Sequence, residues 1–147
     1  MFAPAAALLC SLCWSANAGA QENDLEENEI AVFVGFAHEG RDDGVAIGVE
    51  YERRIDESLG LGLLIEHTFG DFDTWVFALP LTLHVEKWKF VLAPGIEDSN
   101  GGSENLVRIA VGYEIETSKL KMTPIFNVDF VDDETTFVLG VSFGWPF

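Results

Sequence analysis

The chain has 147 residues, a length that suits one domain, and 48% of them are apolar, which is too many for a disordered acidic chain. Its formal net charge of −17 argues against nucleic acid as a partner, because surfaces that bind nucleic acid are basic.

Residues 1–20 predict a secretory signal peptide. An apolar, alanine-rich run precedes small residues, and Ala18-Gly19-Ala20 fits the small-x-small pattern, so we expect cleavage after Ala20. Both cysteines, Cys10 and Cys13, fall in this segment, so the exported chain is expected to have no disulfide and no cysteine-ligated metal. No later stretch approaches the ~18 uninterrupted apolar residues that a membrane-spanning helix needs.

Residues 21–29 are polar and acidic and are expected to form a flexible tail. Residues 30–147 then divide into segments of about the length that a tilted membrane strand needs, ~9–11 residues. These segments are 30–39, 45–54, 59–69, 74–85, 88–97, 105–117, 120–131 and 135–147. None of the intervals has a helical period, so the pattern predicts an all-β, eight-stranded antiparallel up-and-down barrel.

Successive residues of each segment alternate between a large apolar face and a small or polar face. The large face of the last segment carries Phe137, Leu139, Val141, Phe143, Trp145 and Phe147. A soluble lipocalin-type barrel would put such a face inside, whereas a membrane barrel puts it outside. The opposite face is rich in Gly and Ala and poor in Lys, which suits the crowded lumen of an eight-stranded barrel and favours the transmembrane form.

The connections between segments indicate an orientation. Short turns at Asp56, Glu86-Lys87 and Ser118-Lys119 are expected in the periplasm, and longer stretches at 38–44, 70–73 and 98–104 are expected to face outward. Six of the eight Lys and Arg residues lie near the short turns, whereas acidic residues crowd the other connections.

The signal segment, the alternating strands and the C-terminal run Phe143-Gly144-Trp145-Pro146-Phe147 together resemble the small eight-stranded outer-membrane barrels of the outer-membrane protein A and X type. The resemblance covers residues 30–147. It implies a location in the outer membrane of a Gram-negative-type envelope. It also implies that Phe143, Trp145 and Phe147 form a signal read by the outer-membrane insertion machinery.

Three prolines fall inside predicted strands. Pro80, Pro94 and Pro124 each lack the N–H that a strand ladder needs, and a closed barrel has no free edge to accommodate them. Bulges or shifted registers are therefore expected at these positions.

Charged residues on the small face are predicted to form an ion-paired network in the lumen. They are Glu50, Glu66, Arg108, Glu114, Glu116, Lys121 and Asp129. Counting from a two-residue turn at Ser118-Lys119 places Arg108 opposite Asp129 and Glu116 opposite Lys121. Such a plug would compensate buried charge, because a lone buried ion costs several kcal/mol. A gate or a narrow ion path is the functional alternative.

Catalytic and metal sites are not predicted. A serine hydrolase needs a base beside its nucleophile, but His38, His67 and His84 each lack a serine within two residues on the same strand. His67, flanked by Glu66 and Thr68, comes nearest to such an arrangement, but His67 is expected to be an interfacial residue and His84 a lumen residue near Lys89. The acidic connections could offer oxygen ligands to Ca²⁺ or Mg²⁺ but lack the spacing of an EF-hand, so no metal or cofactor is predicted.

The sequence thus predicts a non-enzymatic, monomeric outer-membrane barrel with a structural or surface-interaction role. Its expected partners are outer-membrane lipid, lipopolysaccharide and the insertion machinery. The alternatives are a narrow channel or carrier for small apolar molecules, and a soluble periplasmic lipocalin-like binder. The membrane interpretation fails if Glu50, Arg108, Glu114 and Asp129 point outward.

Overall fold

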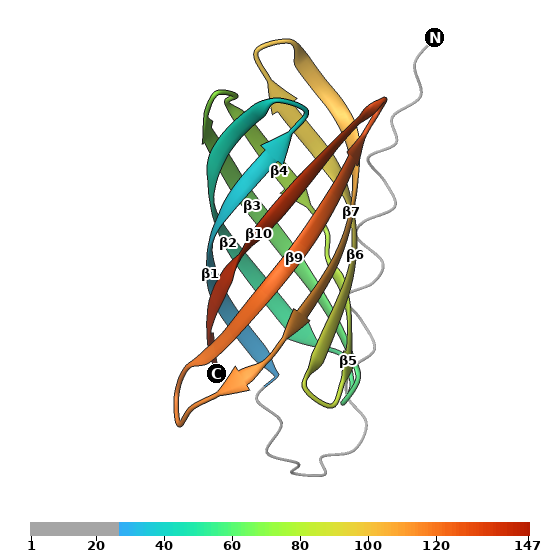
Figure 1. Ribbon diagram of the computed structural model, residues 1–147. Coiled ribbons are helices and arrows are strands. Elements are labelled where there is room, and N and C mark those ends of the chain that lie inside the picture. Colours follow the sequence, from blue (N-terminus) through green and yellow to red (C-terminus); the bar gives the residue numbers. More distant parts are fainter. Residues whose placement is uncertain (1–26) are drawn as a thin grey trace, which may run out of the picture.

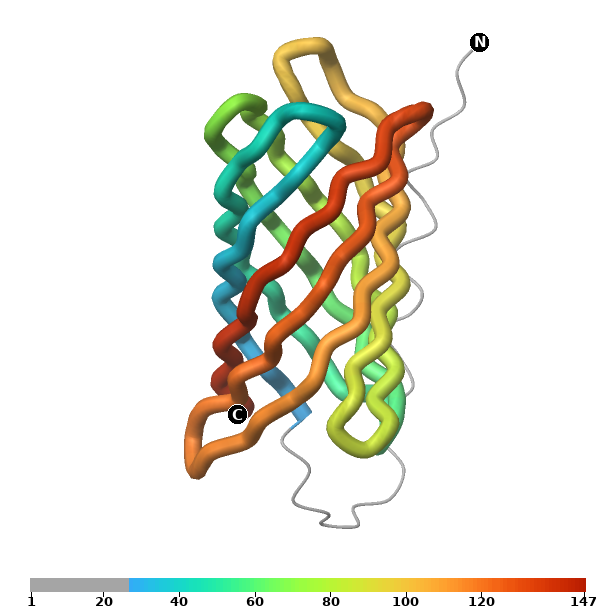
Figure 2. Tube along the Cα trace, viewed as in Figure 1, coloured from blue at the N-terminus to red at the C-terminus, as the bar shows by residue number. Residues whose placement is uncertain are grey.

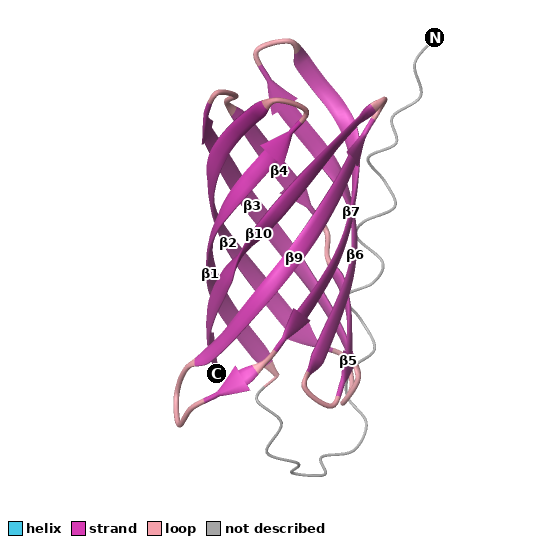
Figure 3. Cartoon of the chain, in the orientation of Figure 1, coloured by secondary structure: helices cyan, strands magenta, loops and turns pink. Residues whose placement is uncertain are grey.

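The computed structural model describes residues 27–147, and all of its regular structure in that range is β-strand (Figure 3). The predicted signal peptide, with Cys10 and Cys13, and most of the predicted acidic tail lie outside the described residues. No helix in the described range is long and apolar enough to cross a membrane.

The strands form one closed, antiparallel barrel in which consecutive strands are neighbours (Figure 1). Their bounds are β1 Asn28–Glu39, β2 Asp42–Arg54, β3 Leu59–Gly70, β4 Thr74–Ala78, β5 Leu81–Val85, β6 Trp88–Ser99, β7 Gly102–Tyr113, β8 Ile115–Glu116, β9 Lys121–Val131 and β10 Glu134–Pro146. β4 continues into β5, and β7 continues into β8, after short interruptions. The ten segments therefore form the eight strands of the barrel wall. The prediction of an eight-stranded up-and-down barrel is confirmed.

Pairing of the first strand with the last closes the barrel. β1 and β10 run antiparallel from Glu29↔Pro146 to Glu39↔Thr136, and beyond them the N–H of Phe147 donates to the carbonyl of Asn28 at 2.8 Å. Both of these residues lie at the same end of the barrel, which we call the terminal end (Figure 2). The opposite end is called the hairpin end. β1 begins at Asn28, two residues earlier than predicted, so Glu29 belongs to the barrel wall.

The prediction of bulges or register shifts at the prolines is wrong. On both sides of the gap at Leu79-Pro80 the same register continues, from Ala78↔Gly95 to Leu81↔Leu92. Pro80 still accepts a bond from the Gly62 N–H at 2.8 Å. Each proline removes one donor from the ladder, and the neighbouring pairs are numerous enough to hold the register without it.

Pro94 and Pro124 follow the same principle. Pro94 pairs with Val107 in an unbroken ladder, and its carbonyl accepts from Leu79. Pro124 pairs with Val141, and on its other side it lies in the gap where pairing passes from β7 to β8. The inside–outside alternation is preserved through both positions.

The hairpin end has no long loops. β1 and β2 are joined by Gly40-Arg41 alone, and β6 and β7 by Asn100-Gly101, so most of the stretches predicted to be outward loops are strand. Gly40 has a φ of 60° and Gly102 a φ of 111°, which glycine adopts readily in tight hairpins. Gly and Asp at these places mark sharp turns between extended strands, not longer connections.

The turn between β2 and β3 at the terminal end is held by Asp56. Its carboxylate accepts from the backbone N–H groups of Ser58 at 2.7 Å and Leu59 at 2.8 Å. These two bonds favour the charged carboxylate and hold the pKa of Asp56 below its ordinary value.

Large apolar side chains cover the outside of the barrel, and small or polar ones fill the inside. Leu63 is 58% exposed while its neighbour Leu64 is 5% exposed, because successive strand residues point to opposite faces. Aromatic side chains lie on the outer surface toward both ends: Phe36, Phe69, Trp75, Phe130 and Phe137 toward the hairpin end, and Trp88, Tyr113, Trp145 and Phe147 toward the terminal end. This distribution is the one expected of a barrel surrounded by lipid.

One large aromatic side chain inside the barrel was not predicted. Phe33 is buried in the lumen, and its ring covers Gly35 and Gly140, where an added Cβ would collide with the ring. The absence of side chains at those glycines creates the space that the ring fills. Glycine on the lumen face therefore serves here as a packing partner for one large residue.

Candidate functional site

A three-residue ion cluster crosses the middle of the lumen. Arg108 on β7 faces Asp129 on β9 in the strand register, and its Nε lies 2.6 Å from the Asp129 Oδ1. Its Nη1 and Nη2 donate to the two carboxylate oxygens of Glu66 on β3, at 2.9 and 2.7 Å. Three other segments, β4, β5 and β6, separate β3 from β7, so this second contact bridges the lumen. All three residues are buried.

The geometry satisfies the charges of this cluster. A guanidinium presents a planar fork that matches a carboxylate, and such paired bonds are stronger and more specific than single ones. Arg108 makes a fork with Glu66 and another with Asp129, whose Oδ2 accepts from Nη2 at 2.7 Å. The cluster thus connects β3, β7 and β9 at one level of the barrel.

A second cluster lies nearer the terminal end. The Lys89 ammonium contacts Glu50 at 2.9 Å and Glu52 at 3.1 Å, and the Nε2 of His84 lies 2.6 Å from the Oε1 of Glu52. His84 was predicted to lie in the lumen near Lys89, and the pairing of His84 with Lys89 confirms this. Glu52 was not included in the predicted network, although its two-residue spacing from Glu50 places it inside.

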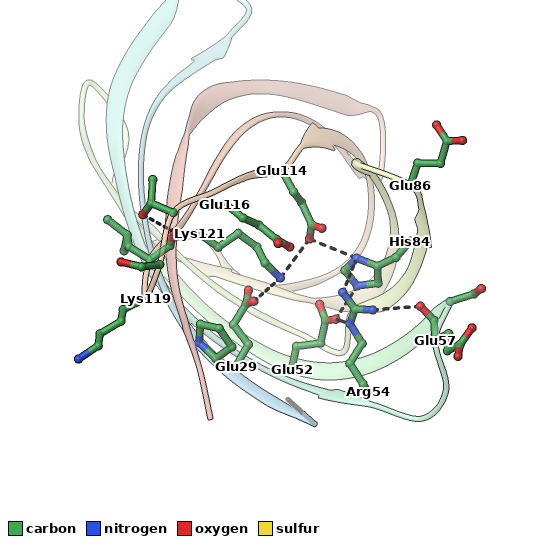
Figure 4. Close-up of a pocket in the computed structure, with 15 residues that line it drawn as sticks. Glu29, Glu52, Arg54, Glu57, His84, Glu86, Glu114, Glu116, Lys119 and Lys121 are labelled. Atoms are coloured by element: carbon green, nitrogen blue, oxygen red, sulfur yellow. Dashed lines mark hydrogen bonds and ion pairs between the residues drawn. The ribbon is translucent and has the colours of Figure 1, made fainter. Parts of the chain in front are cut away.

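Beyond this cluster the lumen opens into a cavity of about 590 Å³, which we call the vestibule (Figure 4). The ammonium of Lys121 lies at its wall, 2.7 Å from Glu29 and 3.5 Å from Glu114. Arg54 also lines the vestibule, and its Nε lies 3.3 Å from Glu52. The vestibule is therefore a polar chamber whose floor is the second cluster.

His84 contacts three charged side chains at the vestibule floor. Arg54 Nη2 lies 3.0 Å from His84 Nδ1, and His84 Nε2 lies 2.6 Å from Glu52 Oε1. Glu114 Oε1 is 3.2 Å from the same Nδ1 and accepts no hydrogen bond from a described residue. A buried carboxylate oxygen is thus left with an open acceptor position.

Six of the seven predicted network residues lie inside the barrel, but not as one network. Glu66, Arg108 and Asp129 meet at the centre, Glu50 meets Lys89, and Glu114 and Lys121 meet in the vestibule. Glu116 pairs with Lys121 in the register as predicted and lines the vestibule at its mouth, but its side chain is exposed and makes no ion pair with Lys121. β8 is only two residues long and lies at the mouth, where Lys121 turns to Glu29 and Glu114 instead.

The nearest hydrolase-like grouping is separated by the barrel wall. His67 stacks on the outward Trp75 ring with centroids 4.4 Å apart, and its Nε2 lies 2.6 Å from Asp73. Its neighbours Glu66 and Thr68 are buried on the lumen side. Among the described residues, no group of three or more His, Cys, Asp or Glu side chains is placed to hold a metal ion.

Glu50, Arg108, Glu114 and Asp129 therefore point inward, while the large apolar side chains point outward. No family model and no curated protein sequence matches the chain. The N-terminal barrel domain of Pseudomonas aeruginosa OprF superimposes with a TM-score of 0.63 at 10% identity, covering 82% of this chain and 98% of that one. The fold is that of the small outer-membrane barrels of the outer-membrane protein A and X type.

Two further outer-membrane barrels share this fold. The attachment invasion locus protein Ail of Yersinia pestis has a TM-score of 0.56 at 12% identity, covering 82% of this chain and 96% of Ail. Neisserial surface protein A has a TM-score of 0.54 at 10% identity, and the match covers 82% of this chain and 96% of that one. At such identities the likeness establishes the small outer-membrane barrel fold alone, so a role has to be argued from this chain's own residues.

Proposed function

We propose that this chain is a non-enzymatic outer-membrane protein whose closed barrel is a rigid, ion-paired support for a structural or surface-interaction role. The outer-membrane barrels that share its fold support this location. The terminal end would face the periplasm and the hairpin end the exterior, as in this class of barrel.

The observation that carries the closed-lumen proposal is the Arg108 cluster. The three charged side chains cross the lumen at its centre, and the cavity beside them, lined by Phe33, Glu66 and Arg108, has a volume of about 30 Å³. That is room for roughly one or two water molecules. A hydrated ion or an apolar solute would have to break buried ion pairs to pass, which disfavours the channel and carrier alternatives.

The surface role rests on the acidic hairpin end. Its carboxylates are Glu39, Asp42, Asp43, Asp71, Asp73, Glu97, Asp98, Glu104, Asp132, Asp133 and Glu134. Within it, Asp71 accepts from the backbone N–H of Asp43 at 3.0 Å, and Asp43 in turn lies 2.6 Å from His38. The proposed contacts around this rim are outer-membrane lipid and lipopolysaccharide, the latter bridged by divalent cations because bare carboxylates would repel its anionic groups.

The outward aromatic residues of β10 have a second proposed role before folding. Phe143, Trp145 and Phe147 would be read by the insertion machinery while β10 is still unpaired. In the folded barrel Trp145 and Phe147 are exposed on the outer surface near the terminal end. They are therefore available both to a recognising protein during assembly and to the lipid interface afterwards.

Conductance in planar lipid bilayers tests the closed lumen. We expect the wild-type barrel to show no large, steady open events. The variant Glu66→Ala/Arg108→Ala/Asp129→Ala removes the central cluster without leaving a lone charge, and it should conduct. Large steady events from the wild-type protein would contradict the proposal and favour a channel.

A further inference from the structure

We propose that the vestibule at the terminal end binds an organic cation with flexible primary ammonium groups, of the aliphatic polyamine class. Nothing in the closed-lumen proposal requires such a ligand. The inference rests on the charge of the vestibule, on an unsatisfied buried carboxylate and on the size and openness of the cavity.

The vestibule has more carboxylates than cations. Its acidic lining residues are Glu29, Glu52, Glu57, Glu86, Glu114 and Glu116. Its basic lining residues are Arg54, His84, Lys119 and Lys121. The excess of carboxylates around the cavity raises the local concentration of cations.

Glu114 provides the specific acceptor. It is 4% exposed and lines the vestibule, where Figure 4 shows it extending between Lys121 and His84. Its Oε1 is 3.5 Å from the Lys121 ammonium, which donates to Glu29 at 2.7 Å, and 3.2 Å from His84 Nδ1, and it accepts no hydrogen bond from a described residue. A buried carboxylate oxygen without a donor is costly, and an N–H of a bound ammonium would satisfy it.

The distribution of the carboxylates favours a flexible organic cation over a metal ion. A metal needs several ligands converging on one point, and no such group of acidic or histidine side chains occurs among the described residues. The inward-pointing carboxylates Glu29, Glu52, Glu114 and Glu116 are instead spread around a chamber of about 590 Å³ (Figure 4). A polyamine carries several separated ammonium groups, each able to contact a different carboxylate. Since the chamber opens at the terminal end, such a ligand would enter from the periplasm.

Spermidine binding to the full barrel in lipid nanodiscs tests this site, by calorimetry at low and at physiological salt. We expect wild-type protein to bind spermidine, and Glu114→Gln to bind it at least about tenfold more weakly, the change that a lost charge-assisted bond gives. The matched control is Glu104→Gln, which removes the same charge at the hairpin end and should leave the affinity unchanged. Heat-modifiable gel mobility establishes that each variant is folded.

Three results would overturn the proposal. The first is that folded wild-type protein binds no spermidine at low salt. The second is that Glu104→Gln and Glu114→Gln weaken binding equally, which would indicate only a general attraction to an acidic protein. The third is that Mg²⁺ alone occupies the site with equal or greater affinity and displaces spermidine, which would indicate a divalent-ion site.

Discussion

We expect the substitution Arg108→Ala to lower the free energy of unfolding of the barrel by about 3–5 kcal/mol, the cost of breaking a buried ion cluster by removing one partner. Glu66 and Asp129 would keep their charges in a buried lumen without the guanidinium that now contacts both. Urea unfolding in lipid vesicles, followed by the emission of the outward Trp75, Trp88 and Trp145, would measure the change.

Two controls separate charge compensation from simple loss of packing. The variant Glu66→Gln/Arg108→Met/Asp129→Asn has no uncompensated charge and should recover most of the lost free energy. Lys119→Ala removes an exposed cation in the turn before β9 and should change the free energy of unfolding by at most about 0.5 kcal/mol. A loss of less than about 1 kcal/mol for Arg108→Ala, the size typical of exposed pairs, would contradict a buried cluster.

Arginine on the outward face should be costly in proportion to its depth in the membrane. Leu63 lies near the middle of β3 and is 58% exposed, so Leu63→Arg is expected to cost about 2–4 kcal/mol of folding free energy. The reason is that its guanidinium would enter hydrocarbon at the middle of the bilayer. Reversible folding into vesicles gives the measurement.

The first residue of the same strand is the matched control. Leu59 points to the same outer face but begins β3 at the terminal end, so Leu59→Arg should cost only about 0–1 kcal/mol. Equal losses of folding free energy at the two positions would indicate that the cost of arginine does not depend on depth in a bilayer. A neutral Leu63→Arg would place that side chain in water and contradict a membrane barrel.

Alternation and turn positions were enough to predict the strands and which way their side chains point. Side chains alternate between the two faces of a strand, and this alternation gives the inward position of Arg108 and the outward position of Leu63. The turns at Ser118-Lys119 and Asp56 give the register in which the neighbouring strands pair. The hairpin end was harder to predict. Gly40 and Gly102 indicate a turn, but only the paired strands show that the chain turns within two residues.

Contacts across the lumen could not be predicted from neighbouring strands. Arg108 meets Glu66 because two long side chains reach each other from strands that are not adjacent, and pairing within the sheet gives no information about that. Glu116 shows the opposite limit: its parity was correct for the lumen, but β8 ends at the mouth and leaves the side chain exposed. The position of a residue along the barrel axis, and not only the face of the strand that it occupies, decides whether its side chain is buried in the lumen.

The inside-out arrangement of the barrel is tested most directly by contacts between lipid chains and two adjacent leucines. In nanodiscs with methyl-labelled leucine, we expect nuclear Overhauser effects from acyl-chain protons to the methyl groups of Leu63, which is 58% exposed. Leu64, which is 5% exposed and lies in the lumen, should show none. Lipid contacts to Leu64, or water contacts in their place at Leu63, would contradict the membrane barrel proposed for this chain.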